Sequence, residues 1–156
     1  MNIIINATQH SATPEQVEAG VYASTHEESL RKWLTFDSLP SRLYIQQHAS
    51  FIADLVLRQA IEIVKNADAQ GPIQKHVQML AGIPAYNETV CKTFHIKAMI
   101  GGAPYLMSEL EKELWYRGIE PVYAFTKRES VESVDENGNV TKTAIFKHAG
   151  FVSAIQ

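Results

Sequence analysis

The chain begins with a short apolar segment that restricts the folds open to it. Residues 2–7 read Asn-Ile-Ile-Ile-Asn-Ala, without the alternation of apolar and polar residues that a half-exposed strand shows. A run of this kind is typical of a strand covered on both faces, and such strands occur mainly in parallel sheets. We therefore expect the first element to be a buried strand of an α/β sheet.

Helix-start signals follow this first strand. Residues 13–16 supply a threonine N-cap, a proline at the first helical position and a glutamine that completes a capping box. Thr25 with Glu28 predicts a second capping box, which opens a helix to about residue 36. Apolar residues then recur at helical spacing over residues 40–66 and predict a long, mostly buried helix.

The second half of the chain repeats the pattern of strand, turn and helix. Residues 94–100 predict a strand, and Gly101-Gly102 breaks it. Pro104 suits the first position of the next helix, and Gly118 suits the position after its end. Residues 122–125 are apolar at every position, which predicts another strand covered on both faces.

A hairpin closes the chain. Asn137-Gly138 is a strong signal for a two-residue turn, and residues 140–148 predict the returning strand, which Phe151 and Val152 extend. The whole pattern predicts an α/β fold of the Rossmann-like, three-layer sandwich type, with a mostly parallel sheet and a C-terminal antiparallel hairpin. We expect one α/β domain over residues 1–156, with residues 67–93 as an insertion or a lid.

Composition and charge exclude several classes of function. The net charge is −3 and the pI is about 6.1, which argues against a partner that is a long nucleic acid. No stretch approaches the roughly 20 apolar residues of a membrane span. Cys91 is the only cysteine, which fits a reducing compartment, and we expect a cytoplasmic protein. The histidines show no metal-ligand spacing, and we expect neither a metal nor a cofactor.

Ligands of open α/β sheets bind beyond the carboxyl ends of the strands. Three segments are expected there: the polar loop after the first strand, the glycine turn before a helix N-terminus, and the end of the strand at residues 122–125. Glycine amides and a helix N-terminus suit an anion, although a tight turn alone also explains the glycines. The candidate ligand-binding residues are Thr8, Gln9, Ser11, Gly101, Gly102, Ala103, Tyr105, Thr126 and Ser130.

The hairpin adds candidate catalytic residues. A two-residue turn pairs Arg128 with Lys147 and Lys127 with His148. Like charges opposed across a ladder are destabilising, and a bound phosphate would offset the repulsion. Two alternatives remain open: Glu129 could neutralise Lys127, and a register shift of one residue would re-pair the strands.

His10 completes the set of candidate catalytic residues. A histidine in a loop at this edge could move a proton, and a histidine with only a structural role is the alternative. Cys91 has no recognisable basic helix terminus beside it, so we interpret it as inert.

Residues 122–132, 137–142 and 146–151, with the upstream Ile100-Gly-Gly-Ala-Pro-Tyr-Leu, resemble the C-terminal part of small CRISPR-associated proteins. The group is the CARF-like (CRISPR-associated Rossmann fold) ring nucleases. The whole chain, from Asn-Ala-Thr-Gln-His onward, also resembles uncharacterised proteins encoded in Mu-like prophages.

The ring-nuclease resemblance implies a homodimer that cleaves cyclic oligoadenylate without metal, by attack of a ribose 2′-OH on the neighbouring phosphorus. The apolar tail at Phe151, Val152 and Ile155 also suggests a homodimer, because such a tail needs cover. In a prophage, cleaving this messenger would serve counter-defence. Two other classes stay open: a non-catalytic nucleotide sensor or phage accessory protein that binds a host partner, and an enzyme acting on a small phosphorylated substrate.

Overall fold

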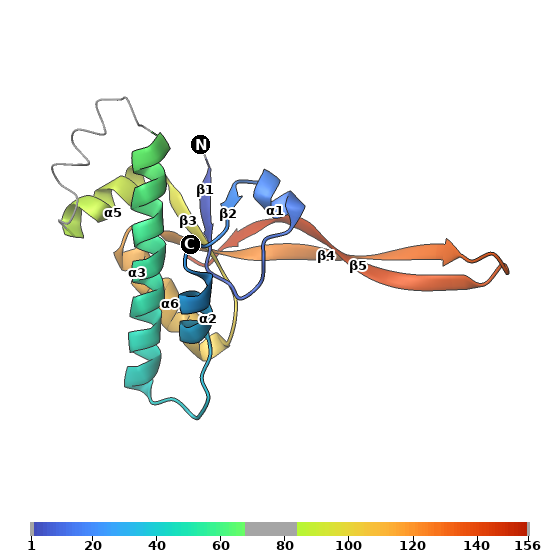
Figure 1. Cartoon of the computed structure of the whole chain (residues 1–156), viewed down its shortest axis with the longest axis horizontal. Helices are drawn as coiled ribbons and strands as arrows, with labels where there is room; N and C mark the ends of the chain where they lie inside the picture. The colour runs from blue at the N-terminus through green and yellow to red at the C-terminus, as the bar shows by residue number, and fades with distance from the viewer. Residues whose placement is uncertain (1, 68–83, 156) are drawn as a thin grey trace.

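The computed structural model of the chain describes residues 2–67 and 84–155, which contain a mixed five-stranded sheet (Figure 1). The strand order is β2-β1-β3-β4-β5, with the first four strands parallel and β5 antiparallel to β4. The prediction of an α/β fold with a mostly parallel sheet and a closing antiparallel pair is confirmed. The strands are β1 (Ile3–Asn6), β2 (Val21–Tyr22), β3 (Ile96–Ile100), β4 (Glu120–Val134) and β5 (Val140–Ser153).

The helices connect these strands. They are α1 (Pro14–Glu18), α2 (Glu27–Leu34), α3 (Arg42–Ala67), α5 (Pro84–Thr93) and α6 (Pro104–Tyr116). In the described ranges, no helix has both the length and the apolar character that a membrane crossing requires. Of the insertion or lid expected over residues 67–93, residues 84–93 form α5, and residues 68–83 lie outside the described residues.

The two faces of the sheet are covered unequally. Alternation along β1 points Ile3 and Ile5 into the larger core, which is built with side chains of α2, α3, α5 and α6. Ile4, between them, joins Val21, Met99 and Val122 in a much smaller cluster on the other face, on the side of α1 (Figure 1). Because α1 is a single short helix, much of the sheet on that side is left free for a pocket and for the ends of β4 and β5.

The expected capping box at Thr25 and Glu28 is wrong. The helix begins at Glu27, and His26 at its N-cap makes no side-chain capping bond. The backbone amide of Thr25 instead donates to Gln59 Oε1 of α3 at 3.1 Å, and Gln59 Nε2 donates to the carbonyl of Ala23 at 2.7 Å. A buried polar side chain needs such partners, so tertiary contact overrides the local signal.

The predicted long helix is present, but it begins two residues later than expected, at Arg42. The hydroxyl of Ser41 accepts a hydrogen bond from the amide of Tyr44 at 3.2 Å. A serine that does this acts as the N-cap, and the proline before it lies outside the helix. The threonine cap and capping box of α1 are confirmed, and so are Pro104 at the start of α6 and Gly118 after its end.

A long ribbon continues β4 and β5 beyond the sheet. Residues 126–134 and 140–148 pair only with each other, and in Figure 1 they project away from the helices. We call these two segments and their turn the ribbon. The expectation that residues 122–125 are covered on both faces is wrong at Phe125, which is 49% exposed where the ribbon leaves the sheet. An extra residue in β5 opposite Phe125 and Thr126 marks this point.

The turn of the ribbon is longer than predicted. Val134 pairs with Val140, and the amide of Asp135 donates to the carbonyl of Asn139 at 3.0 Å. Asp135 Oδ1 accepts from the amides of Asn137 and Asn139 at 2.9 and 2.8 Å, which holds the five-residue loop. The two-residue turn at Asn137-Gly138 is therefore wrong, and the register differs from the prediction by one residue.

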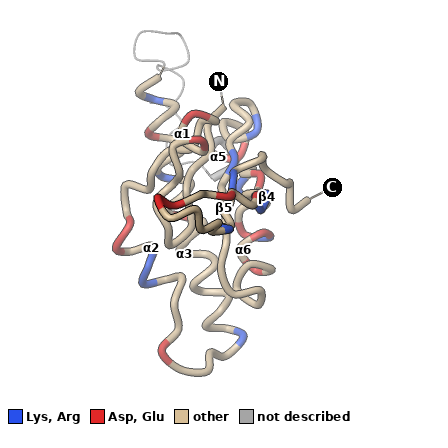
Figure 2. The backbone as a smooth tube through the Cα atoms, turned by 90° about the vertical axis from the view of Figure 1, so that its right-hand side faces the viewer, with Lys and Arg blue, Asp and Glu red and all other residues tan. Residues whose placement is uncertain are grey.

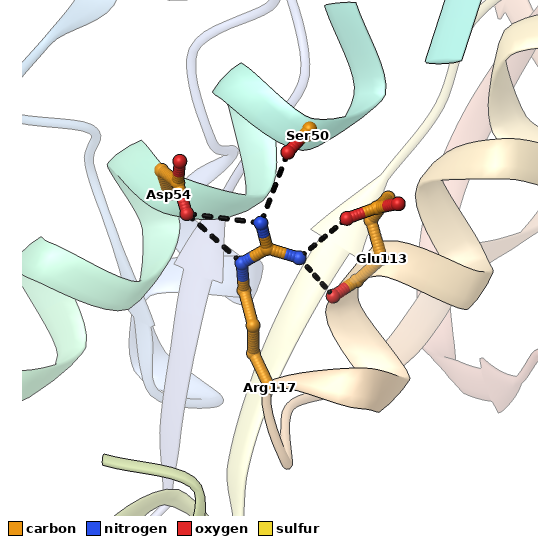
Figure 3. A network of polar contacts seen from close by, with 4 residues as sticks. All are labelled: Ser50, Asp54, Glu113 and Arg117. Carbon is orange, nitrogen blue, oxygen red and sulfur yellow. Dashed lines mark hydrogen bonds and ion pairs between the residues drawn. The ribbon is translucent and has the colours of Figure 1, made fainter. Parts of the chain in front are cut away.

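The far end of α6 is fixed to α3 by one arginine (Figure 3). Arg117 Nη1 donates to the carbonyl and the carboxylate of Glu113 at 2.7 and 2.6 Å. Its Nε and Nη2 lie 3.0 Å from Asp54 Oδ1, and Nη2 also donates to Ser50 Oγ at 3.1 Å. Because every branch of the guanidinium is occupied within the fold, we interpret this cluster as structural.

Candidate functional site

An open pocket of about 510 Å³ lies beyond the carboxyl ends of β1 and β3, beside Tyr123 and Ala124 of β4. The strand order makes this a switch point, because β1 is flanked by β2 on one side and by β3 on the other. The loops that follow two such neighbouring strands run in opposite directions, and a crevice lies between them. The lining residues are Thr8, Gln9, His10, Ser11, Thr13, Gln16, Met99, Ile100, Gly101, Gly102, Tyr123 and Ala124.

The first wall of the pocket is the loop after β1, and a buried asparagine shapes it. Asn6 is 5% exposed, and its Oδ1 accepts from the amide and the hydroxyl of Thr8 at 3.0 and 2.8 Å. Its Nδ2 donates to the carbonyl of His10 at 2.8 Å. The loop backbone is thus held in one conformation, while the exposed side chains of Gln9, His10 and Ser11 face the pocket region.

The second wall is the glycine turn between β3 and α6. A Cβ atom added to Gly101 would lie 3.7 Å from Thr8 Cγ2, so the turn lies against the first loop. Ala103 is the N-cap of α6 and has no side-chain capping bond, with Pro104 directly after it. Pro104 has no amide hydrogen, and the amide of Leu106 donates to the carbonyl of Ala103 at 3.0 Å, so an anion at this turn would meet the amide of Tyr105 and the helix dipole.

The third wall comes from β4. Tyr123 lines the pocket, and its hydroxyl donates to Glu111 Oε1 of α6 at 2.6 Å. Burial and the neighbouring carboxylate raise the pKa of Tyr123 above its usual value. The hydroxyl therefore stays protonated, and its proton is committed to Glu111 and unavailable for a ligand.

The ribbon cations do not form the pairs that the sequence predicted. Lys127 lies opposite Lys147, Arg128 opposite Phe146, and His148 opposite Thr126. Directly paired residues share a face, and faces alternate along a strand. One pair of like charges is opposed, as the sequence reasoning anticipated, but it is Lys127 with Lys147.

Alternation also divides the cations between the two faces of the ribbon. Ala124 pairs with Phe151 on the pocket side of the sheet, so Arg128 and His148 share that side. The ring of His148 lies 4.7 Å from that of Phe151, in agreement with this placement. Lys127 and Lys147 belong to the opposite face. The predicted single cluster of four cations is therefore two pairs.

The base of the ribbon lies near α1. The pKa of Glu15 is lowered, chiefly by a hydrogen bond from its own backbone amide and by one from the Thr13 side chain. The positive charges of His148 and Lys147 contribute smaller effects in the same direction. Thr13 lines the pocket, whereas Lys147 and His148 are not among its lining residues.

The sequence-predicted site residues divide into two groups. Thr8, Gln9, His10, Ser11, Gly101 and Gly102 come together around the pocket. The remaining candidates lie outside its lining: Ala103, Tyr105, Thr126, Ser130, Lys127, Arg128, Lys147 and His148. Sequence reasoning missed Tyr123, whose apolar neighbours suggested only a buried strand, and Asn6, whose role depends on the loop that it holds.

Two further sequence interpretations concern reactive side chains. Cys91 is fully buried in the larger core, and burial raises its pKa to about 12, which fits an inert thiol. Among the described residues, no group of three His, Cys, Asp or Glu side chains is placed to hold a metal ion.

Comparison with known families covers the second half of the molecule. Residues 66–152 match the model of the uncharacterized protein MJ1673 family. The chain belongs to this family. The segment shared with the MJ1673 family contains β3, the glycine turn, α6 and both strands of the ribbon. No curated protein and no solved structure matches the chain. The resemblances to CARF-like ring nucleases and to Mu-like prophage proteins stay predictions.

Proposed function

We propose that this MJ1673 family member binds a nucleotide phosphate in the pocket beyond β1 and β3. The observation that carries the proposal is the contact between the Gly101-Gly102 turn and the loop at Thr8, in front of the N-terminus of α6. Backbone amides and the helix dipole at this place favour an anion. Hydroxyl and amide side chains of Thr8, Gln9 and Ser11 can hydrogen-bond the sugar or the phosphate oxygens.

The size of the pocket limits what it can take. A volume of about 510 Å³ lies within the ordinary range of small-ligand sites and suits one nucleotide unit. A cyclic oligoadenylate is larger, so one pocket would hold one adenylate of the ring while a second subunit holds another. Two pockets related by a two-fold axis match the symmetry of such a ring.

The finer proposal is a metal-free ring nuclease, as the resemblance to the CARF-like Rossmann fold implies. A ribose 2′-oxygen of the ligand attacks the neighbouring phosphorus, a P–O2′ bond forms and the P–O5′ bond breaks. His10 takes the 2′-hydroxyl proton, and a proton is returned to the departing 5′-oxygen. The products are then a 2′,3′-cyclic phosphate and a free 5′-hydroxyl.

Charge on the phosphate oxygens has to be stabilised during this step. The amides of Gly101 and Gly102 supply one part. Arg128 and His148, which share the pocket side of the ribbon, supply another. Lys127 and Lys147 act only at longer range. Arg128→Met should therefore weaken ligand binding about tenfold, because a charge-assisted hydrogen bond is worth roughly 1.5–3 kcal/mol, and Lys127→Met should weaken it less.

The deciding experiment incubates the pure protein with cyclic tetra-adenylate and hexa-adenylate in the presence of a chelator, and measures both binding and products. His10→Ala should retain binding and lose cleavage by about a hundredfold or more. Gly101→Val, which fills the space before Thr8, should lose binding itself. The variant Glu62→Gln, at an exposed position of α3, is the control and should behave as wild type.

One observation favours a second candidate. The volume of about 510 Å³ lies within the range of small-molecule sites, which also suits an enzyme acting on a small phosphorylated substrate. Binding of a mononucleotide or sugar phosphate, sensitive to Gly101→Val and without any affinity for the cyclic ligands, would select this alternative. Binding of the cyclic ligand without cleavage by any preparation would select a nucleotide sensor. Failure of every phosphorylated probe to bind would overturn the proposal.

A further inference from the structure

The ribbon is a pair of strands that exposes several large apolar side chains to water. Val131 and Ile145, which are 43% and 44% exposed, lie on the face that carries Lys127 and Lys147. Phe146, Val134 and Val140, which are 71%, 67% and 59% exposed, lie on the other face. A two-stranded ribbon alone is only marginally stable, and its outer backbone groups are free to pair with another strand. These features indicate a surface that a protein partner covers.

Charge is distributed unevenly along the ribbon. The base carries Lys127 opposite Lys147, so two positive charges lie side by side. The tip carries Asp135 and Glu136, and the loop that contains them is fixed by the hydrogen bonds of Asp135. Figure 2, which looks toward the tip, shows negative residues there and positive residues behind them. Glu129 offsets one positive charge at the base, and Glu132 pairs with Lys142 at 3.3 Å between the two ends, so the ribbon has a net positive base and a negative tip.

We propose that the partner of the ribbon is the ribbon of a second copy of this chain, laid against it in the opposite direction. Each acidic tip then meets the lysine pair at the base of the other ribbon, and the face that carries Val131 and Ile145 covers the same face of the other copy. An arrangement with two such identical contacts is a two-fold symmetric interface. The proposal stands on the ribbon alone and does not require the pocket to bind a nucleotide.

The spacing along the strand fixes where the two-fold axis passes. Val131, opposite Thr143, lies four residues from Lys127 and four residues from Asp135. At about 3.3 Å per residue, base and tip are roughly 26 Å apart, with Val131 in the middle. Two ribbons aligned base to tip therefore bring Val131 of each copy close to its own counterpart across the axis.

Charge reversal gives the first test. Lys147→Glu alone and Glu136→Lys alone should each weaken dimerisation about tenfold or more, because each dimer contains the altered contact twice. A one-to-one mixture of the two variants should form a heterodimer, since the acidic base of one now meets the basic tip of the other. Sedimentation velocity measures each mass, and Glu62→Lys on α3 is the control that should stay dimeric.

Cross-linking gives the second test, because buried Cys91 is the only cysteine. Val131→Cys should form a disulfide-linked dimer rapidly under mild oxidation. Ser133→Cys, on the same face but two residues nearer the tip, should not, because its two copies lie on either side of the axis, roughly 13 Å apart. Melting temperature and far-ultraviolet circular dichroism establish that the variants fold.

Several results would overturn the proposal. A wild-type monomer at tens of micromolar would do so, and so would a dimer that neither charge reversal weakens. Failure of the mixed variants to associate would exclude the base-to-tip pairing. Equal cross-linking by Val131→Cys and Ser133→Cys would exclude an axis at Val131. All of these measurements are made without nucleotide, so they do not depend on the proposed function.

Discussion

The side-chain amide of Asn6 donates a hydrogen bond to the main-chain carbonyl of His10 across 2.8 Å. The same side chain accepts two hydrogen bonds from Thr8, so one buried residue at the end of β1 holds the loop that forms a wall of the pocket. The loop that carries His10 is therefore ordered by the strand before it and does not need a ligand to shape it.

Replacing Asn6 by aspartate should loosen this loop. The aspartate keeps the acceptor for Thr8 but places a second acceptor against the His10 carbonyl, and we expect a loss of roughly 1–3 kcal/mol in the free energy of unfolding. Amide hydrogen exchange at Thr8 and His10 should become faster. Asn66→Asp, at an exposed position of α3, is the control. Unchanged exchange at both loop amides would show that the loop is held by other contacts.

Removing the guanidinium of Arg117 should destabilise the fold. Arg117→Met leaves Asp54, Glu113 and Ser50 without their common partner, and we expect a loss of roughly 1.5–3 kcal/mol in chemical denaturation. Arg117→Lys should restore only part of the lost stability, because one ammonium group cannot reach all three partners of the planar guanidinium. The exposed pair of Lys112 with Glu109 offers a control, and Lys112→Met should change stability by less than about 0.5 kcal/mol. Equal effects at both positions would refute the structural role of Arg117.

Two glycines with a left-handed backbone should respond differently to alanine. Gly118 has φ +75°, and an added Cβ would lie 2.6 Å from the carbonyl oxygen of Glu88. Gly138 has φ +80° and open space around it. Gly138→Ala should therefore cost only the conformational strain of about 1–2 kcal/mol or less, while Gly118→Ala adds a backbone clash. Thermal denaturation compares the two, and similar losses would contradict the close approach of α5 to Gly118.

The ribbon turn should be sensitive to acid only at low pH. Hydrogen bonds from the backbone and side chain of Asn139, and from the backbone of Asn137, lower the pKa of Asp135 from the ordinary 3.8. Because the pKa of Asp135 is lower in the folded state, the ionised carboxylate contributes its full stabilisation of the turn above the ordinary pKa. This stabilisation is lost as the pH falls through the lowered pKa. The amide shifts of Asn137 and Asn139 should thus titrate with a midpoint below 3.8.

Asp135→Asn should abolish this titration while keeping an acceptor in the turn. A midpoint at or above the ordinary value for aspartate would show that the hydrogen bonds of the loop do not persist in solution.

Much of the sheet could be predicted from local patterns. The isoleucine run of β1, the capping box of α1 and the proline and glycine at the ends of α6 each act within a few residues, so the chain reveals them directly. The loop after β1 and the glycine turn were expected at one edge because parallel strands bring their carboxyl ends together, and both line the pocket.

The register of the ribbon could not be predicted in the same way. Asn137-Gly138 is a strong turn signal, but Asp135 binds two amides of the loop and widens it to five residues. A shift of one residue in register then moves Arg128 from Lys147 to Phe146 and changes which cations share a face. The hydrogen bond from Tyr123 to Glu111 joins a strand to a helix, and no local sequence pattern predicts such a contact.

Successive side chains along β4 and β5 point to opposite faces, so the length of the ribbon decides which side chains its tip presents on each face. Removing two residues from each strand would shorten it by roughly 6.6 Å and keep every remaining side chain on its original face. Removing one from each would turn the tip over and direct the other set of side chains toward whatever the ribbon meets. Because residues 126–148 contribute nothing to the larger core, such changes leave the body intact. Within the family, we therefore expect the length of each ribbon strand to differ by two residues or a multiple of two.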